Sequence, residues 1–295
     1  MTTAPFGTVL TAMATAFAPD GSVDLEATQR IARHLVDHGH DGLVVSGTTG
    51  ESPTTTKEED GETLAAVREA VGPDIALVAG VGTNDTTTST WLAQQAGKAG
   101  ADGVLLVTPY YSKPSQRGIL QHFRTVIDAA ELPVMLYDIP SRTGSQLAWS
   151  SYEEMAGWDE VVAVKDAVGD LPRGSRLIEL GFAIYSGDDV LNLAWLAHGA
   201  VGLVSVAGHV CGDELRAMYD AFTGGDPVRA REIYARLLPA IDAVMGTPNY
   251  GATTAKAGLE LLGVLDNRRV RSPLAALDDD EVAALRAGLT ASGLL

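Results

Sequence analysis

The stretch Val161-Val162-Ala163-Val164-Lys165 is a continuous apolar run that ends in a lysine. Runs of this kind, in which apolar and polar residues do not alternate, are typical of parallel strands whose two faces are both covered. Seven similar runs recur along the chain, and helix-length amphipathic stretches lie between them. The predicted strands are 8–17, 42–46, 75–81, 103–108, 133–138, 161–165, 183–186 and 202–206.

The segments between these runs carry helix signals. Residues 24–37 place Ile31 and Leu35 on one face and are followed by Gly39, a residue type that commonly ends a helix. Asn84 and Asp85 can cap a second helix, and residues 116–130 and 213–222 read similarly. The alternation of strands and helices predicts an α/β fold with right-handed crossovers.

Two α/β architectures fit this alternation, a doubly wound sheet and a barrel. The eight units, and the lack of a glycine-rich fingerprint after the first strand, favour a (β/α)8 TIM barrel, and 295 residues suit one. After the eighth unit the pattern is purely helical, over 227–245, 253–262 and 279–289. No Pro- or Ser-rich linker precedes these helices. We therefore expect a catalytic barrel over residues 1–224 and a C-terminal helical appendage over residues 225–295 that packs on it.

Composition excludes several classes of function. The formal net charge of −17 argues against nucleic-acid binding, which needs clustered Lys and Arg. The single cysteine, Cys211, excludes an intramolecular disulfide framework. The six histidines show no convincing ligand spacing, so we expect no metal. The chain has neither a membrane-length apolar run nor a signal-like start, which predicts a cytoplasmic protein without a membrane partner.

Lys165 is the central candidate for catalysis. Barrel enzymes carry their catalytic groups at the carboxyl ends of the strands, and Lys165 ends the sixth predicted strand. Desolvation by the apolar residues before it should lower the pKa of its amine, which makes a lysine nucleophilic toward a carbonyl. A structural lysine paired with Asp166 is the alternative. Neighbouring residues of a strand point to opposite faces, however, so Asp166 should not accompany Lys165 into the barrel.

Two other strand ends carry groups that suit an anionic substrate. Gly47-Thr48-Thr49-Gly50 offers backbone N–H groups and two hydroxyls, which can hold a carboxylate and relay a proton. Arg142 follows the fifth strand and could grip a second carboxylate with two parallel hydrogen bonds. Taken alone, the threonine motif is a weak signal that an ordinary βα turn also explains, and a surface arginine is the default interpretation of Arg142.

Together these motifs resemble those of the dihydrodipicolinate synthase / N-acetylneuraminate lyase family of pyruvate-dependent barrels, over essentially the whole chain. Three features are most similar to the branch that condenses pyruvate with aspartate-4-semialdehyde in lysine and diaminopimelate biosynthesis. They are Gly47-Thr-Thr-Gly-Glu-Ser52, Tyr110-Tyr111 and Pro140-Ser-Arg-Thr-Gly144. The sialic acid and ketodeoxygluconate branches usually have Ser in place of Thr48 and lack the arginine.

The resemblance implies four catalytic residues. Lys165 forms a Schiff base with pyruvate, and Tyr137 donates and accepts protons beside it. Thr48 and Tyr111 complete a proton relay, in which Tyr111 reaches into the site of a neighbouring subunit. Such an arrangement implies a homotetramer built as a dimer of dimers.

The resemblance also implies four substrate-binding residues. Thr49 and the backbone at Val204 bind pyruvate, Gly187 lies against it, and Arg142 receives the carboxylate of the semialdehyde. No cofactor is expected, because the protonated imine is itself the electron sink. Two rival functions stay open: a pyruvate aldolase that acts on a sugar acid or another aldehyde, and a catalytically silent paralogue that only binds a ketoacid.

The chain departs from the family pattern at several positions. Asp138 and Asp166 replace the Asn and Glu that are common there, which should leave the mechanism intact. Other departures fall where regulated members bind feedback lysine at the tetramer interface. Pro53, Lys57 and Thr88 stand where those enzymes have a small residue, a histidine and a glutamate.

We predict from these three replacements that lysine inhibits the protein weakly or not at all. A cationic side chain at position 57 and a missing carboxylate at position 88 should repel a cationic amino acid or fail to grip it. Turnover measured at millimolar lysine checks this, and clear suppression would contradict it.

Overall fold

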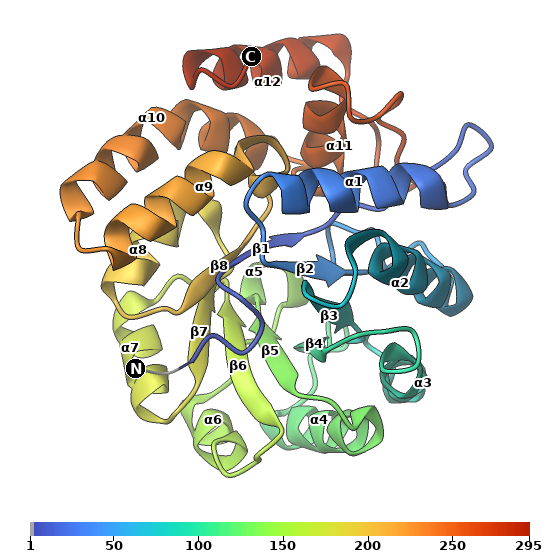
Figure 1. Ribbon diagram of the computed structural model, residues 1–295. Helices are drawn as coiled ribbons and strands as arrows, with labels where there is room; N and C mark the ends of the chain where they lie inside the picture. The colour runs from blue at the N-terminus through green and yellow to red at the C-terminus, as the bar shows by residue number, and fades with distance from the viewer. Residues whose placement is uncertain (1–2) are drawn as a thin grey trace.

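The computed structural model describes residues 3–295, so the first two residues of the predicted barrel lie outside the described range. Within it, eight parallel strands close into a barrel in which each strand pairs with the next and β8 pairs with β1 (Figure 1). The predicted (β/α)8 barrel is therefore confirmed. The strands are β1 (Val9–Ala12), β2 (Gly42–Val45), β3 (Ala76–Gly80), β4 (Gly103–Val107), β5 (Val134–Asp138), β6 (Val161–Asp166), β7 (Ala183–Ser186) and β8 (Gly202–Ser205).

Helices surround the barrel, and side-chain caps begin several of them. Asp24, Asp85 and Ser115 each accept a hydrogen bond from an amide of the first helical turn. No helix within residues 3–295 combines the length and apolarity that a membrane span needs. The helices that alternate with the strands are α1 (Leu25–Asp37), α2 (Lys57–Val71), α3 (Thr86–Ala96), α4 (Gln116–Ala130), α5 (Pro140–Thr143), α6 (Trp149–Met155), α7 (Leu171–Glu179), the short η1 (Asp189–Leu191), α8 (Asn192–Ala197) and α9 (Gly208–Thr223).

Most predicted helices have the bounds that their patterns indicated, and α9 is the main exception. It begins at Gly208, whereas the sequence pattern predicted a start at residue 213. The extra turn contains two glycines and a non-helical residue, Cys211, at φ −139° and ψ 36°. Glycine has a poor helix propensity, so this turn has no recognisable helical pattern.

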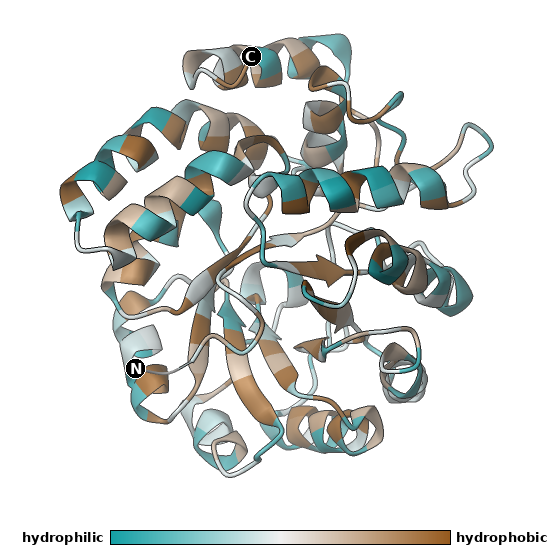
Figure 2. Ribbon diagram, in the orientation of Figure 1, coloured by the Kyte–Doolittle hydropathy of each residue, from teal (hydrophilic) through white to brown (hydrophobic). Residues whose placement is uncertain are grey.

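The strands are mostly apolar along their length, as their brown colour in Figure 2 shows. One set of side chains fills the barrel interior and includes Val44, Leu105, Met135 and Tyr137. The alternate set packs outward against the helices and includes Leu43, Val45, Leu106 and Leu136. Tyr137 of β5 is in register with Lys165 of β6, so both belong to the inward-facing set.

Phe6 packs inside the barrel at the end where the strands begin. It belongs to the interior apolar cluster and is 1% exposed. A Cβ on Gly103, the first residue of β4, would lie 2.3 Å from the Phe6 ring, so this close approach requires a glycine. The carboxyl ends of the strands are at the opposite end, where the candidate catalytic residues lie.

Three further helices, α10 (Pro227–Met245), α11 (Ala252–Leu261) and α12 (Asp279–Ala291), follow the eighth unit and lie together on one side of the barrel (Figure 1). Their apolar side chains share one buried cluster with α9 and with Val9 and Leu203 of the barrel. The expected C-terminal helical appendage is thus present and packed on the barrel. The division between residues 224 and 225 stays a prediction.

Asp138 and Asp166 end β5 and β6 in register and point outward, toward α7. Both side chains are fully buried, and Arg173 binds the two of them at 2.7 and 3.0 Å. The Tyr152 hydroxyl donates a further hydrogen bond to Asp138 at 3.0 Å. Burial raises the pKa of both carboxyls, and the Arg173 guanidinium opposes that rise. Asp138 and Asp166, the two acidic residues expected to replace Asn and Glu, therefore bind the same arginine.

We expect Arg173→Met to destabilise the protein by about 3–5 kcal/mol, because two buried carboxylates lose their counter-ion. Denaturant unfolding at pH 8 measures the loss. It should shrink at acidic pH, since protonation removes the uncompensated charge. Arg176→Met, at an exposed position of the same helix, is the control and should stay within about 0.5 kcal/mol of the wild type. Equal stability of both variants would contradict the role of Arg173.

Candidate active site

A cavity opens at the carboxyl ends of the strands, where barrel enzymes carry out their chemistry. Its wall includes residues of β1, β2, β4, β5 and β6 and of the segments after β2, β5, β6, β7 and β8. Six of the eight predicted site residues line it: Thr48, Thr49, Tyr137, Arg142, Lys165 and Gly187. Positions separated by more than a hundred residues in the sequence are therefore brought together around one space.

Lys165 is the buried amine of this cavity. It is 4% exposed, and its Nζ lies 4.3 Å from the centroid of the Tyr137 ring. Burial is the main cause that lowers the pKa of Lys165 to about 8; the carboxylate of Asp189 opposes this shift, and the positive charge of Arg142 contributes to it. Such a lysine is partly neutral near neutral pH, as a nucleophile toward carbonyls must be.

A second buried lysine does not compete for this role. Burial also lowers the pKa of Lys256 to about 8, but its Nζ lies 2.5 Å from Glu51 Oε1 in a buried ion pair. Lys256 is not among the residues that line the cavity. The amine available to a substrate in this cavity is that of Lys165.

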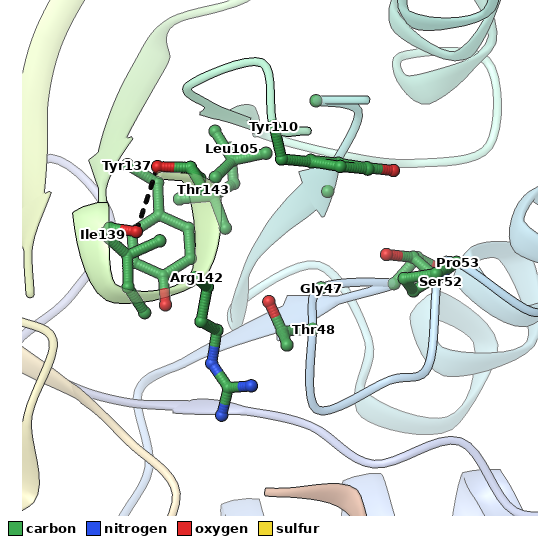
Figure 3. A pocket seen from close by; sticks show the side chains of 14 residues that line it. Gly47, Thr48, Ser52, Pro53, Leu105, Tyr110, Tyr137, Ile139, Arg142 and Thr143 are labelled. Atoms are coloured by element: carbon green, nitrogen blue, oxygen red, sulfur yellow. Dashed lines mark hydrogen bonds between the residues drawn. The ribbon is translucent and has the colours of Figure 1, made fainter. Parts of the chain in front are cut away.

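Tyr137 and Arg142 reach the cavity from β5 and from α5, the single helical turn that follows it. Burial raises the pKa of the Tyr137 phenol, so the hydroxyl stays protonated and can donate. The Thr143 hydroxyl donates to the Ile139 carbonyl at 3.1 Å and stabilises the helical turn that carries Arg142. Figure 3 shows Arg142, Tyr137 and Thr48 directed toward the same space.

The turn after β2 carries the two threonines. Thr49 is buried, whereas Thr48 is exposed at the rim of the cavity. Thr48, Tyr137 and Arg142 also line an adjoining, mostly apolar hollow that continues to Pro53 and Tyr110 (Figure 3). The site therefore combines an amine, a guanidinium and hydroxyls at one end with an apolar extension at the other.

Two predicted site residues lie elsewhere. Tyr111 is 87% exposed, has a left-handed backbone at φ 71° and does not line the cavity. Its contribution to a neighbouring subunit stays a prediction. Val204 is 1% exposed within the barrel interior, and Val206, two residues further on, lines the cavity in its place.

Sequence patterns missed the contribution of the C-terminal appendage. Met245, Tyr250 and Gly251 line the cavity, and the Tyr250 ring centroid lies 4.8 Å from the Arg142 guanidinium carbon. Such a cation–π contact restrains the guanidinium above the cavity. The signal was available as Gly246-Thr-Pro-Asn-Tyr-Gly251, a non-helical interruption between two helices, but nothing in it indicated which surface it would meet.

Asp189 was also missed, although it lies only three residues after the end of β7. Its carboxylate accepts hydrogen bonds from the Ser205 hydroxyl and from the Val206 and Ala207 amides, at 2.5 to 2.8 Å. These bonds hold the segment after β8 in place beside the cavity.

Among residues 3–295, no three His, Cys, Asp or Glu side chains are arranged to hold a metal ion.

The sequence model of the dihydrodipicolinate synthetase family matches residues 5–292. The chain belongs to this family. It is 53% identical to the 4-hydroxy-tetrahydrodipicolinate synthase of Kineococcus radiotolerans over 291 aligned residues. The alignment covers 98% of this chain and 94% of that protein. The family resemblance inferred from the strand-end motifs is therefore confirmed.

Solved structures of the family have the same fold. Dihydrodipicolinate synthase from Cyanidioschyzon merolae, crystallised with lysine bound, matches with a TM-score of 0.94 and 38% identity, over 99% of this chain and 100% of that one. The chloride-inhibited enzyme from Acinetobacter baumannii, in complex with pyruvate, matches with a TM-score of 0.92 and 30% identity, over 98% of this chain and 100% of that one.

The burial of Lys165 predicts a pH dependence for attack on a carbonyl. Only the neutral amine reacts, so imine formation with pyruvate should rise about tenfold per pH unit at acidic pH and level off above a pKa of about 8. Rapid borohydride quenching between pH 6 and 10 measures this rate. A rate that keeps rising to pH 10 would show that the amine titrates like an exposed lysine.

Proposed function

We propose that this protein condenses pyruvate with L-aspartate-4-semialdehyde to give 4-hydroxy-tetrahydrodipicolinate, a step of lysine and diaminopimelate biosynthesis. The observation that carries the proposal is the buried amine of Lys165, with its lowered pKa, in a cavity shared with Tyr137, Thr48 and Arg142. Curated relatives that are about half identical over nearly the whole chain carry the same activity in their names.

In the proposed reaction the neutral Lys165 amine adds to the ketone carbon of pyruvate, and water leaves as the imine forms. The protonated imine withdraws electrons, so the pyruvate methyl group loses a proton and an enamine results. The proposed acid and base is the hydroxyl of the buried Tyr137, whose ring lies beside the Lys165 amine. Proton transfer by a positioned group of this kind typically contributes about 10²–10⁴-fold to a rate.

The enamine then attacks the aldehyde carbon of the second substrate. The amino group of that substrate adds to the imine carbon, Lys165 leaves as the free amine, and a six-membered ring closes. Thr48 and Tyr111 relay protons to and from Tyr137. Thr49 and the backbone at Val204 hold pyruvate against Gly187.

Arg142 is the proposed receptor for the carboxylate of the semialdehyde. The protein has a net charge of −17, so its overall field repels anionic substrates. Local cations must therefore attract them, and Arg142 and Lys165 are the two that line the cavity. Tyr250 keeps the guanidinium in place through its ring face.

We further propose that the protein acts in the cytoplasm as a homotetramer, a dimer of dimers. The exposed Tyr111 ring supports this assembly, because a tyrosine that is 87% exposed in one subunit is available to another. Tyr111 does not line the cavity of its own subunit.

Borohydride reduction with pyruvate, followed by peptide mass spectrometry and a coupled reductase assay with aspartate-4-semialdehyde, tests the proposal. The wild type should give an adduct on Lys165 and turnover, and Lys165→Ala should abolish both. Lys98→Ala, at an exposed lysine on the outer surface, is the matched control. Arg142→Ala should keep the adduct and lose at least about tenfold in turnover of the semialdehyde.

Each other outcome points to a different function. If the wild type forms the adduct but does not turn over the semialdehyde, the protein is a pyruvate aldolase that acts on another aldehyde. Absence of any adduct would overturn the Schiff-base mechanism and leave a ketoacid-binding barrel.

A further inference from the structure

A buried ion pair connects the turn after β2 with α11. Glu51 directly follows Gly47-Thr48-Thr49-Gly50, and its carboxylate lies 2.5 Å from the Lys256 amine. The side chains of Glu51 and Lys256 are 0% and 1% exposed. Two charges taken out of water need further partners. Lys256 also donates to the Arg269 carbonyl, and the second Glu51 oxygen accepts from the Arg271 amide, both at 2.8 Å.

A second connection joins the same C-terminal segment to the start of α2. The Arg271 guanidinium binds both oxygens of Glu59 at 2.6 and 2.7 Å, a bidentate geometry, and donates to the Thr54 carbonyl at 2.9 Å. The Phe17 ring lies against both cations, 4.1 Å from Lys256 Nζ and 4.5 Å from the Arg271 guanidinium carbon. Lys256 and Arg271, here called the C-terminal clamp, thus hold the β2–α2 connection at its middle and at its α2 end.

The turn itself adopts a backbone conformation that needs outside support. Glu51 has a left-handed φ of 61°, which costs free energy for a residue with a Cβ. The Glu51 amide donates to the Thr48 carbonyl at 3.1 Å, and the Glu51 carbonyl accepts from the Thr54 amide at 2.9 Å. The position of Glu51 therefore sets the position of Thr48 and Thr49 just before it.

We propose that Glu51, Lys256 and Arg271 are positioning residues, through which the C-terminal appendage holds the Thr48-Thr49 turn against Lys165. The inference deepens the proposed function and rests on it. None of the three side chains lines the catalytic cavity, so they act through the turn. Displacing a catalytic group by about 1 Å can cost about 10²-fold in rate. The rate should therefore depend on where the turn is held.

The chain provides a matched control for the clamp. Arg268 and Glu260 form an ion pair at 2.7 Å with side chains 27% and 28% exposed, close to the 2.6 Å, 21% and 23% of Arg271 and Glu59. Arg268 lies in the same segment but binds α11, the Leu277 carbonyl and Asp279, and it has no bond to the β2–α2 connection. Loss of either arginine removes a similar ion pair, but only Arg271 supports the turn.

The experiment compares Glu51→Gln, Arg271→Met and Arg271→Lys with Arg268→Met in the full-length protein. Hydrogen exchange of peptides from residues 46–56 is measured by mass spectrometry, together with kcat and KM for pyruvate, at a temperature where circular dichroism shows each variant folded. We expect faster exchange of the turn and a fall of at least about tenfold in kcat/KM for Glu51→Gln and Arg271→Met. Arg271→Lys should recover part of the loss, and Arg268→Met should stay within about twofold of the wild type.

The outcomes separate the clamp from the proposed function. Unchanged exchange of the turn in Glu51→Gln and Arg271→Met, or an equal loss in Arg268→Met, would overturn the clamp. So would faster exchange with wild-type kcat and KM. A wild type that forms no pyruvate adduct would refute the proposed function instead, and the exchange measurement would still decide whether the clamp holds the turn.

Discussion

The alternation of side chains along β5 and β6 is the constraint on which the rest of the site depends. Tyr137 and Lys165 face the interior because they are in register, and Asp138 and Asp166, one residue further on, must then face α7. The same geometry thereby separates the buried amine of Lys165 from two carboxylates that would hold it protonated. Arg173 neutralises those carboxylates on the outer side. A slip of one residue in either strand would exchange the two sets and destroy both.

Burial then lowers the pKa of the Lys165 amine, which no longer has Asp138 or Asp166 beside it. The barrel interior desolvates Lys165, and the positive charge of Arg142 adds to the lowering of its pKa. In a strongly acidic protein, the cations that face the cavity are held there by specific contacts, including the Tyr250 ring against Arg142. The C-terminal helices contribute to this arrangement as well as to the apolar cluster under them. Residues far along the chain thus become part of the site.

Much of the site could be predicted from local sequence. The position of Lys165 at a strand end, the Gly-flanked threonines and the arginine after β5 follow from patterns within a few residues, and the barrel brings them together. Tyr250, Asp189 and the Glu51–Lys256 pair could not be predicted in this way. Each depends on a contact between segments far apart in the sequence, and no local pattern states which distant residue a side chain will meet.

The sequence by itself determined the eight-unit barrel and the chemical types at its rim, because strand periodicity and apolar runs are local properties. Tertiary structure alone decided that Asp138 and Asp166 share Arg173, and that Lys256 is neutralised by Glu51 while Lys165 is left facing the cavity. Both lysines are buried and both have a pKa lowered to about 8. The difference between a structural and a reactive amine lies in the partner that folding places beside it.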